Sequence, residues 1–136
     1  MTALFLGSVY AIYSLPTHRG TKIPLIRQWQ KNATIDPERI KSWRRQFEQP
    51  NFSGLMGPRS RAWALDVDGV IGQASEKDLK ATIPFAPGWQ TVSGSGIGGH
   101  YIFPLSRELS EIGGFTIHNS VGRIAPGIDV RGVGGQ

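Results

Sequence analysis

Two aspartates, Asp66 and Asp68, are the clearest candidates for chemistry in this sequence. They stand two residues apart at the end of Ala62–Asp68, where the residue types alternate as they do in a β-strand. Side chains two apart on a strand project from the same face, so both carboxylates can reach shared cations. Repulsion between the two charges favours a divalent metal as their partner. The same pair also fits a strand end whose acids are simply solvated or bind lysine.

A third acid, Asp129, stands two residues before Arg131. We expect both side chains on one face of a strand over residues 128–131. One interpretation is a local ion pair. The other makes Asp129 a third metal ligand and Arg131 a phosphate contact, because the guanidinium fork matches the spacing of phosphate oxygens.

The glycine-rich segment Ser93–Gly99 and the histidine after it, His100, are candidates for phosphate binding. Successive backbone N–H groups can point at phosphate oxygens there, because glycine permits positive φ angles. Under this hypothesis the contacts fall at Ser95, Gly98 and Gly99. A flexible hairpin turn explains the same glycines, and the segment lacks the Gly-Lys-Ser/Thr ending of a P-loop. His100 is either a phosphate donor or a structural histidine.

The composition of the chain limits its cofactors and partners. The 136 residues include no cysteine, so any metal must be bound by carboxylates and histidine. A formal net charge of +5 favours a polyanionic partner such as nucleic acid or a triphosphate. The apolar segment Leu4–Leu15 is too short to span a bilayer and lacks the basic start of a signal peptide. We therefore expect a buried strand there, no membrane partner and a cytoplasmic protein.

Short strands and a few helices are expected to position these residues. We predict a helix that begins at Asp36-Pro37 and ends near Gln49, and a short helix from Ser75 to about Ala81. Strands are predicted over residues 9–14, 62–68, 90–92, 100–103 and 128–131, with a hairpin between the third and fourth and a less regular stretch over 104–126. This pattern predicts an α+β fold, in which a mainly antiparallel sheet is covered on one side by helices. At this length we expect a single domain over residues 1–136.

The order of these motifs resembles the bifunctional primase-polymerase domain of the archaeo-eukaryotic primase superfamily. The matching segments are Gly20–Pro24 with Trp29, Ala33–Glu38 with Trp43, Leu65–Gly69, Ser93–Phe103 and Gly127–Gly132. The resemblance implies an amino-terminal αβ unit packed on a sheet similar to an RNA-recognition motif. Members of the family usually continue past the last motif, so we expect residues 1–136 to be incomplete at the C-terminal end. Their second motif often has serine where this chain has Gly98, which removes one hydrogen bond that would support His100.

The resemblance also implies which residues form the site. Two divalent ions, Mg²⁺ or Mn²⁺, would be held by Asp66, Asp68 and Asp129. His100 would contact the nucleotide phosphates. Further nucleotide contacts are expected from Arg131 and Lys22.

The implied activity is that of a DNA primase/polymerase, which transfers nucleotides from nucleoside triphosphates to a primer or initiating nucleotide on a DNA template. A replicative helicase is an expected partner, and a phage, plasmid or integrated mobile element an expected source. Two alternatives stay open. One is a metal-dependent phosphodiesterase or nuclease, since two-metal carboxylate sites also serve hydrolysis. The other is a non-catalytic module that binds single-stranded nucleic acid.

Overall fold

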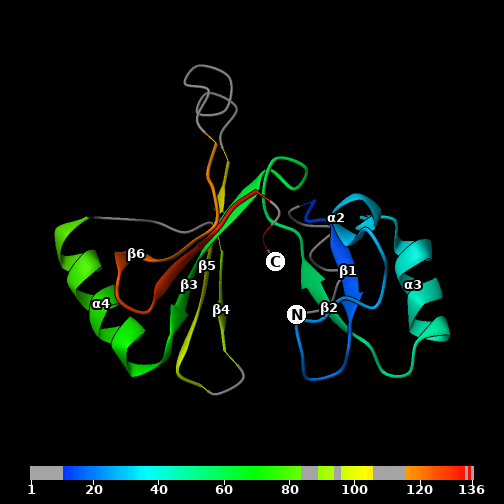
Figure 1. The fold of residues 1–136 in the computed structure, drawn as a ribbon, viewed down its shortest axis with the longest axis horizontal. Coiled ribbons are helices and arrows are strands. Elements are labelled where there is room, and N and C mark those ends of the chain that lie inside the picture. The colour runs from blue at the N-terminus through cyan, green and yellow to red at the C-terminus, as the bar shows by residue number, and fades with distance from the viewer. Residues whose placement is uncertain (1–10, 84–88, 94–95, 106–115, 134, 136) are drawn as a thin grey trace. The chain divides into compact units, whose positions relative to one another are not determined.

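A computed structural model describes residues 11–83, 89–93, 96–105, 116–133 and 135, and in it the chain forms two compact units (Figure 1). The first unit comprises Met1–Arg61 with Gly134–Gln136, and the second comprises Ala62–Val133. A five-stranded antiparallel sheet, a two-stranded sheet and a few helices make up the fold. The predicted α+β class is thus confirmed. The likeness to an RNA-recognition motif stays a prediction.

The first unit pairs two short strands with two helices. Strands β1 (Ser14–Thr17) and β2 (Asn51–Gly54) are antiparallel, and helices α2 (Trp29–Asn32) and α3 (Pro37–Gln46) lie between them in the sequence. Helix α3 begins as predicted, because the Asp36 side chain accepts a hydrogen bond from the backbone N–H of Glu38 and proline occupies the first turn. The helix ends at Gln46, earlier than the predicted Gln49.

The predicted strand over residues 9–14 is misplaced. Residues 11–13 are not strand, and β1 instead begins at Ser14 and runs to Thr17. Residues 9 and 10 lie outside the described residues. The cause is non-local pairing, because β1 bonds to β2 and is also bridged to Thr34 and Pro24. Such partners leave no trace in a local pattern.

The second unit is built around β3 (Ala62–Asp68). In the sheet order β4-β5-β3-β7-β6, all neighbours are antiparallel. Strand β3 matches its prediction residue for residue, as does β7 (Ile128–Arg131). The predicted hairpin is also present, as β4 (Trp89–Val92) and β5 (Gly98–Pro104). Strand β6 (Ser120–Ala125) was missed, since it falls in the stretch expected to be less regular.

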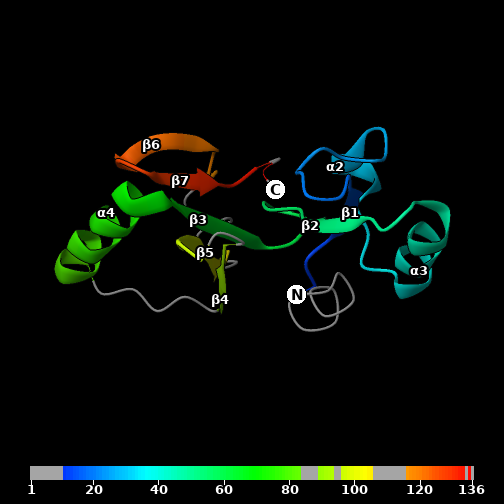
Figure 2. The same ribbon diagram turned by 90° about the horizontal axis from the view of Figure 1, so that it is seen from below.

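One face of this sheet is covered by helix α4 (Gly69–Thr82), which contacts β3, β5 and β7 (Figure 2). The predicted helix start at Ser75 is wrong, because α4 begins directly after Asp68. Ser75 does not cap the helix: its hydroxyl donates to the Pro126 carbonyl at 2.7 Å. None of the helices in the described part of the chain is long and apolar enough to cross a membrane.

The alternation of β3 separates the two faces of the sheet. Leu65 and Val67 point toward α4 and form a buried cluster with Ile128 and Val130 of β7. Burial of this apolar surface stabilises the unit. Asp66 lies between the two apolar residues and therefore points to the opposite face, which we call the acid face.

Candidate functional site

The register of four strands places a row of polar side chains across the acid face. Asp66 is the central member, because His100 of β5 and Asp129 of β7 are both its direct cross-strand partners. Thr91 of β4 is in turn the direct partner of His100. Directly opposite residues in antiparallel strands share a face, with Cβ atoms about 4.5–5.5 Å apart. The sheet thus brings together residues far apart in the sequence.

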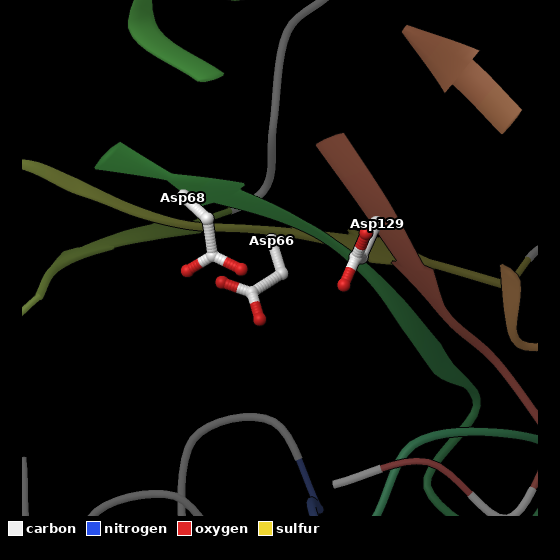
Figure 3. Close-up of side chains that lie close together, drawn as sticks. All are labelled: Asp66, Asp68 and Asp129. Carbon is white, nitrogen blue, oxygen red and sulfur yellow. The ribbon is translucent and has the colours of Figure 1, made fainter. Parts of the chain in front are cut away.

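Three carboxylates converge at one end of this row (Figure 3). Asp66, Asp68 and Asp129 each offer an oxygen that lies within 4.8 Å of the oxygens offered by the other two. Asp66 is 3% exposed and Asp129 8% exposed, whereas Asp68 is exposed at the end of β3. Hard oxygen donors of this kind suit Mg²⁺ and Mn²⁺. The cluster therefore has ligand atoms for a divalent cation and a side open to solvent.

Arg131 bridges two of these acids. Its Nη2 atom lies 3.3 Å from Oδ2 of Asp66 and 3.2 Å from Oδ2 of Asp129. A cation bound between those two oxygens would need the place that the guanidinium nitrogen occupies, so Arg131 and a metal compete for it. The Nε atom of Arg131 is buried and has no acceptor among the described residues. This side chain thus keeps donor capacity for a further acceptor.

Both ring nitrogens of His100 lie within hydrogen-bonding distance of a neighbouring side chain. Its Nε2 atom lies 3.1 Å from Oδ1 of Asp66, and its Nδ1 atom lies 3.0 Å from Oγ1 of Thr91. An ionised carboxylate can only accept hydrogen bonds, so this geometry puts a proton on Nε2. About a third of the side chain is exposed, which leaves His100 accessible from solvent.

Two partners in the site were not predicted from the sequence. Thr91 contacts His100, and the backbone N–H of Gly122 in β6 donates to Oδ1 of Asp129 at 3.0 Å. The hairpin was predicted without its register, which is what places Thr91 opposite His100. Gly122 lies on the strand that was missed, and a backbone donor carries no residue-type signal.

The glycines at the start of β5 have a structural explanation. A Cβ atom at Gly98 would lie 2.0 Å from the Val67 carbonyl oxygen, and one at Gly99 would lie 1.9 Å from the Thr91 carbonyl oxygen. Gly98 also has a φ of +84°, which other residues rarely adopt. Both glycines are thus required by close approach of the strands, whether or not their N–H groups bind phosphate.

Two other predicted nucleotide contacts stay predictions. Ser95 lies outside the described residues. Lys22 is exposed in the loop between β1 and α2 of the first unit, whereas the row belongs to the second.

A second polar cluster lies between α4 and β5. Lys80 and Tyr101 both donate to Glu76, and Lys80 also donates to the Tyr101 hydroxyl at 2.8 Å. Burial raises the pKa of Glu76, but the hydrogen bonds from Lys80 and Tyr101 outweigh it and hold that pKa below its ordinary value. The bond to Glu76 raises the pKa of Lys80, while burial and then Glu76 raise the pKa of Tyr101. This cluster fastens the helix to the sheet.

Comparison with known families agrees with the geometry. No curated protein matches the sequence. A family model described as "Bifunctional DNA primase/polymerase, N-terminal" (Prim-Pol) matches residues 9–136, which is nearly the whole chain. The match spans both units and every residue of the row. Membership of this family implies a DNA-directed nucleotidyltransferase that binds DNA and nucleotides and uses divalent metal. The chain therefore belongs to the family of bifunctional DNA primase/polymerase N-terminal domains.

Proposed function

We propose that the chain catalyses two-metal nucleotidyl transfer, from nucleoside or deoxynucleoside triphosphates to a primer or initiating nucleotide on a DNA template. The observation that carries this proposal is the convergence of Asp66, Asp68 and Asp129, whose carboxylate oxygens lie within 4.8 Å of one another. Family membership supplies the reaction class, and the three acids supply the ligands that this class of reaction needs.

The charge of the cluster supports metal binding. The group holds three carboxylates, and the guanidinium of Arg131 and the imidazole of His100 contact only two of them, Asp66 and Asp129, so it keeps net negative charge. Two of the carboxylates are buried, and buried charge without sufficient compensation is costly. Two divalent cations bound by Asp66, Asp68 and Asp129 would remove that cost.

The acids and the donors of the acid face have different roles in this reaction. Bound Mg²⁺ or Mn²⁺ would lower the pKa of the primer 3′-hydroxyl and neutralise charge on the triphosphate and the leaving pyrophosphate. The three aspartates position the cations. Once metal occupies the carboxylate oxygens that they now contact, His100 from Nε2 and Arg131 from its guanidinium would donate to phosphate oxygens as negative charge develops there. Neither residue needs to transfer a proton for this role, because fixed donors suffice.

Further contacts to the triphosphate come from groups other than the acids, His100 and Arg131. Backbone N–H groups at Ser95, Gly98 and Gly99, with the Lys22 ammonium, bind the triphosphate. The two units act as one catalytic domain over residues 1–136. The proposal also includes a cytoplasmic location, a replicative helicase as partner and a mobile genetic element as source.

Primer extension with the purified chain tests the function. A labelled primer on a DNA template is incubated with deoxynucleotides, then with ribonucleotides, each with Mg²⁺, with Mn²⁺ and with chelator. We expect products longer than the primer only when metal is present. Metal-dependent shortening of the primer would instead identify a nuclease. Binding of single strands without turnover, in metal or in chelator, would identify a non-catalytic module.

A further inference from the structure

We propose that Thr91 is the positioning residue for His100, whose ring it holds so that Nε2–H faces the acid cluster. This inference deepens the proposed function and rests on it for its consequence in catalysis. Thr91 does not touch the aspartates itself. It acts through His100, its direct cross-strand partner in the β4–β5 hairpin.

The two bonds of the imidazole ring define its orientation. Thr91 Oγ1 lies 3.0 Å from Nδ1, and Asp66 Oδ1 lies 3.1 Å from Nε2. The Asp66 carboxylate requires a proton on Nε2, and the Thr91 hydroxyl can either donate to Nδ1 or accept from it. A ring flip would break both bonds at once. Thr91 and Asp66 together therefore fix the direction of the ring.

The backbone explains why this support comes from the neighbouring strand. On β5 itself, the position that shares a face with His100 and precedes it by two residues is Gly98. A side chain there is excluded, since its Cβ would lie 2.0 Å from the Val67 carbonyl oxygen. The place on β4 opposite His100 is open to a side chain and is filled by a β-branched residue, whose χ1 angle is restricted. Thr91 thus supplies a hydroxyl that β5 cannot.

The consequence is a preorganised donor beside the metal ligands. The Nε2–H group is held at Oδ1 of Asp66, so once metal takes that oxygen the donor already lies beside the bound triphosphate and needs little reorientation. Loss of the Thr91 hydroxyl would let the ring turn and would leave His100 present but misdirected. Partners that orient metal-ligating histidines are typically worth about 10–100-fold in metal affinity or activity, and we expect the lower end of that range for His100, which binds no metal itself.

The first test reads the ring directly. The chain has 3 histidines, so ¹⁵N-labelled imidazoles can be assigned with His18→Gln and His118→Gln variants. At one fixed pH and without metal, we expect the wild-type protein and Thr91→Ser to give closely similar His100 spectra, because both keep the hydroxyl that orients the ring. In Thr91→Val, which keeps the shape but removes the hydroxyl, we expect the His100 resonances to shift and broaden as the ring samples a second orientation. An unchanged His100 spectrum in Thr91→Val would overturn the proposal.

The second test follows nucleotide use. We expect Thr91→Val to raise the KM for the incoming nucleotide about tenfold, and Thr91→Ser to restore it to within about twofold of wild type. Thr116→Val makes the same chemical change at an exposed threonine and should have no effect. Equal losses in Thr91→Val and Thr91→Ser would overturn the proposal. If Thr91→Val does not fold, Thr91→Ala takes its place in both tests.

The two tests separate this inference from the proposed function. If the wild-type protein does not extend primers in any metal, the proposed function fails. The ring spectra still decide whether Thr91 orients His100, because they need neither metal nor nucleotide.

Discussion

Side chains on the two faces of β3 are buried to similar extents, but burial is favourable on one face and costly on the other. Leu65 and Val67 are 6% and 2% exposed on the face that α4 covers, and Asp66 between them is 3% exposed on the acid face. Removing the two apolar side chains from water is favourable. Removing the carboxylate from water is costly unless charged and hydrogen-bonded partners compensate it. Burial alone therefore does not distinguish the stabilising face from the functional one.

The difference lies in what each face contacts. The helix-covered face is a closed apolar cluster, whereas the acid face is compensated by His100 and Arg131, which are the donors we assign to the nucleotide. We therefore expect changes on the acid face to alter activity more than stability. Changes on the helix-covered face should do the reverse.

The largest effect is expected at the centre of the acid face. Asp66→Asn keeps the size of the side chain and removes its charge, so extension should fall about a thousandfold or more while the melting temperature changes little. Metal-dependent primer extension and thermal unfolding measure the two quantities. Asp78→Asn, at an exposed position of α4, is the matched control and should behave as wild type. A variant Asp66→Asn that extends primers normally would remove this aspartate from the proposed site.

One residue earlier on the same strand, the opposite outcome is expected. Leu65→Ala removes buried apolar atoms from the cluster beneath α4 and should lower the free energy of unfolding by about 3 kcal/mol. Urea unfolding at a temperature where the variant is still folded gives this value. Mn²⁺ binding by the folded variant should match that of the wild type. A large loss of metal affinity in Leu65→Ala would show that the two faces are not independent.

A smaller effect is expected where a protein cation competes with metal. Arg131→Gln removes the guanidinium that lies between Asp66 and Asp129, so Mn²⁺ should bind about tenfold more tightly in the absence of nucleotide. Calorimetric titration measures this affinity, with Arg123→Gln on exposed β6 as the control. Weaker Mn²⁺ binding in Arg131→Gln would mean that the arginine organises the acids rather than competing for them.

The smallest effect concerns the polar cluster that fastens α4 to β5. The pKa of Glu76 is held below its ordinary value, so its ionised form stabilises the fold above that ordinary value, and this stability is lost as the pH falls through the lowered pKa. Glu76→Gln should therefore cost about 1 kcal/mol at neutral pH, and the difference from wild type should shrink as the pH falls through the lowered pKa of Glu76.

Urea unfolding of both proteins across acidic pH measures this difference. Glu38→Gln alters an exposed pair with Lys41 in the other unit and should cost less than about 0.5 kcal/mol. A difference between wild type and Glu76→Gln that does not shrink as the pH falls would place the effect outside the ionisation of this carboxyl.

Local patterns predicted the elements that carry the acids. The alternation of residues 62–68 gave both the strand and its faces, because the side chains of a strand have a fixed period of two. The start of α3 was also predictable, since Asp36 and Pro37 act within one turn of the helix.

What escaped prediction depends on contacts between distant segments. The order of β3 between β5 and β7 makes Asp66 the partner of both His100 and Asp129, and no local pattern contains that order. The same is true of the bond from the Ser75 hydroxyl to the Pro126 carbonyl, because Pro126 lies outside the local pattern that made Ser75 resemble a helix cap. Thr91 was overlooked because its role follows from register alone.

The central claim is that the acid face binds the catalytic cations. The most direct measurement is a crystal structure of the chain with Mn²⁺ and a non-hydrolysable nucleoside triphosphate, in which anomalous scattering locates manganese. We predict two manganese ions bound by Asp66, Asp68 and Asp129, with the triphosphate beside His100. Manganese bound elsewhere, or a triphosphate bound away from these residues, would contradict the account.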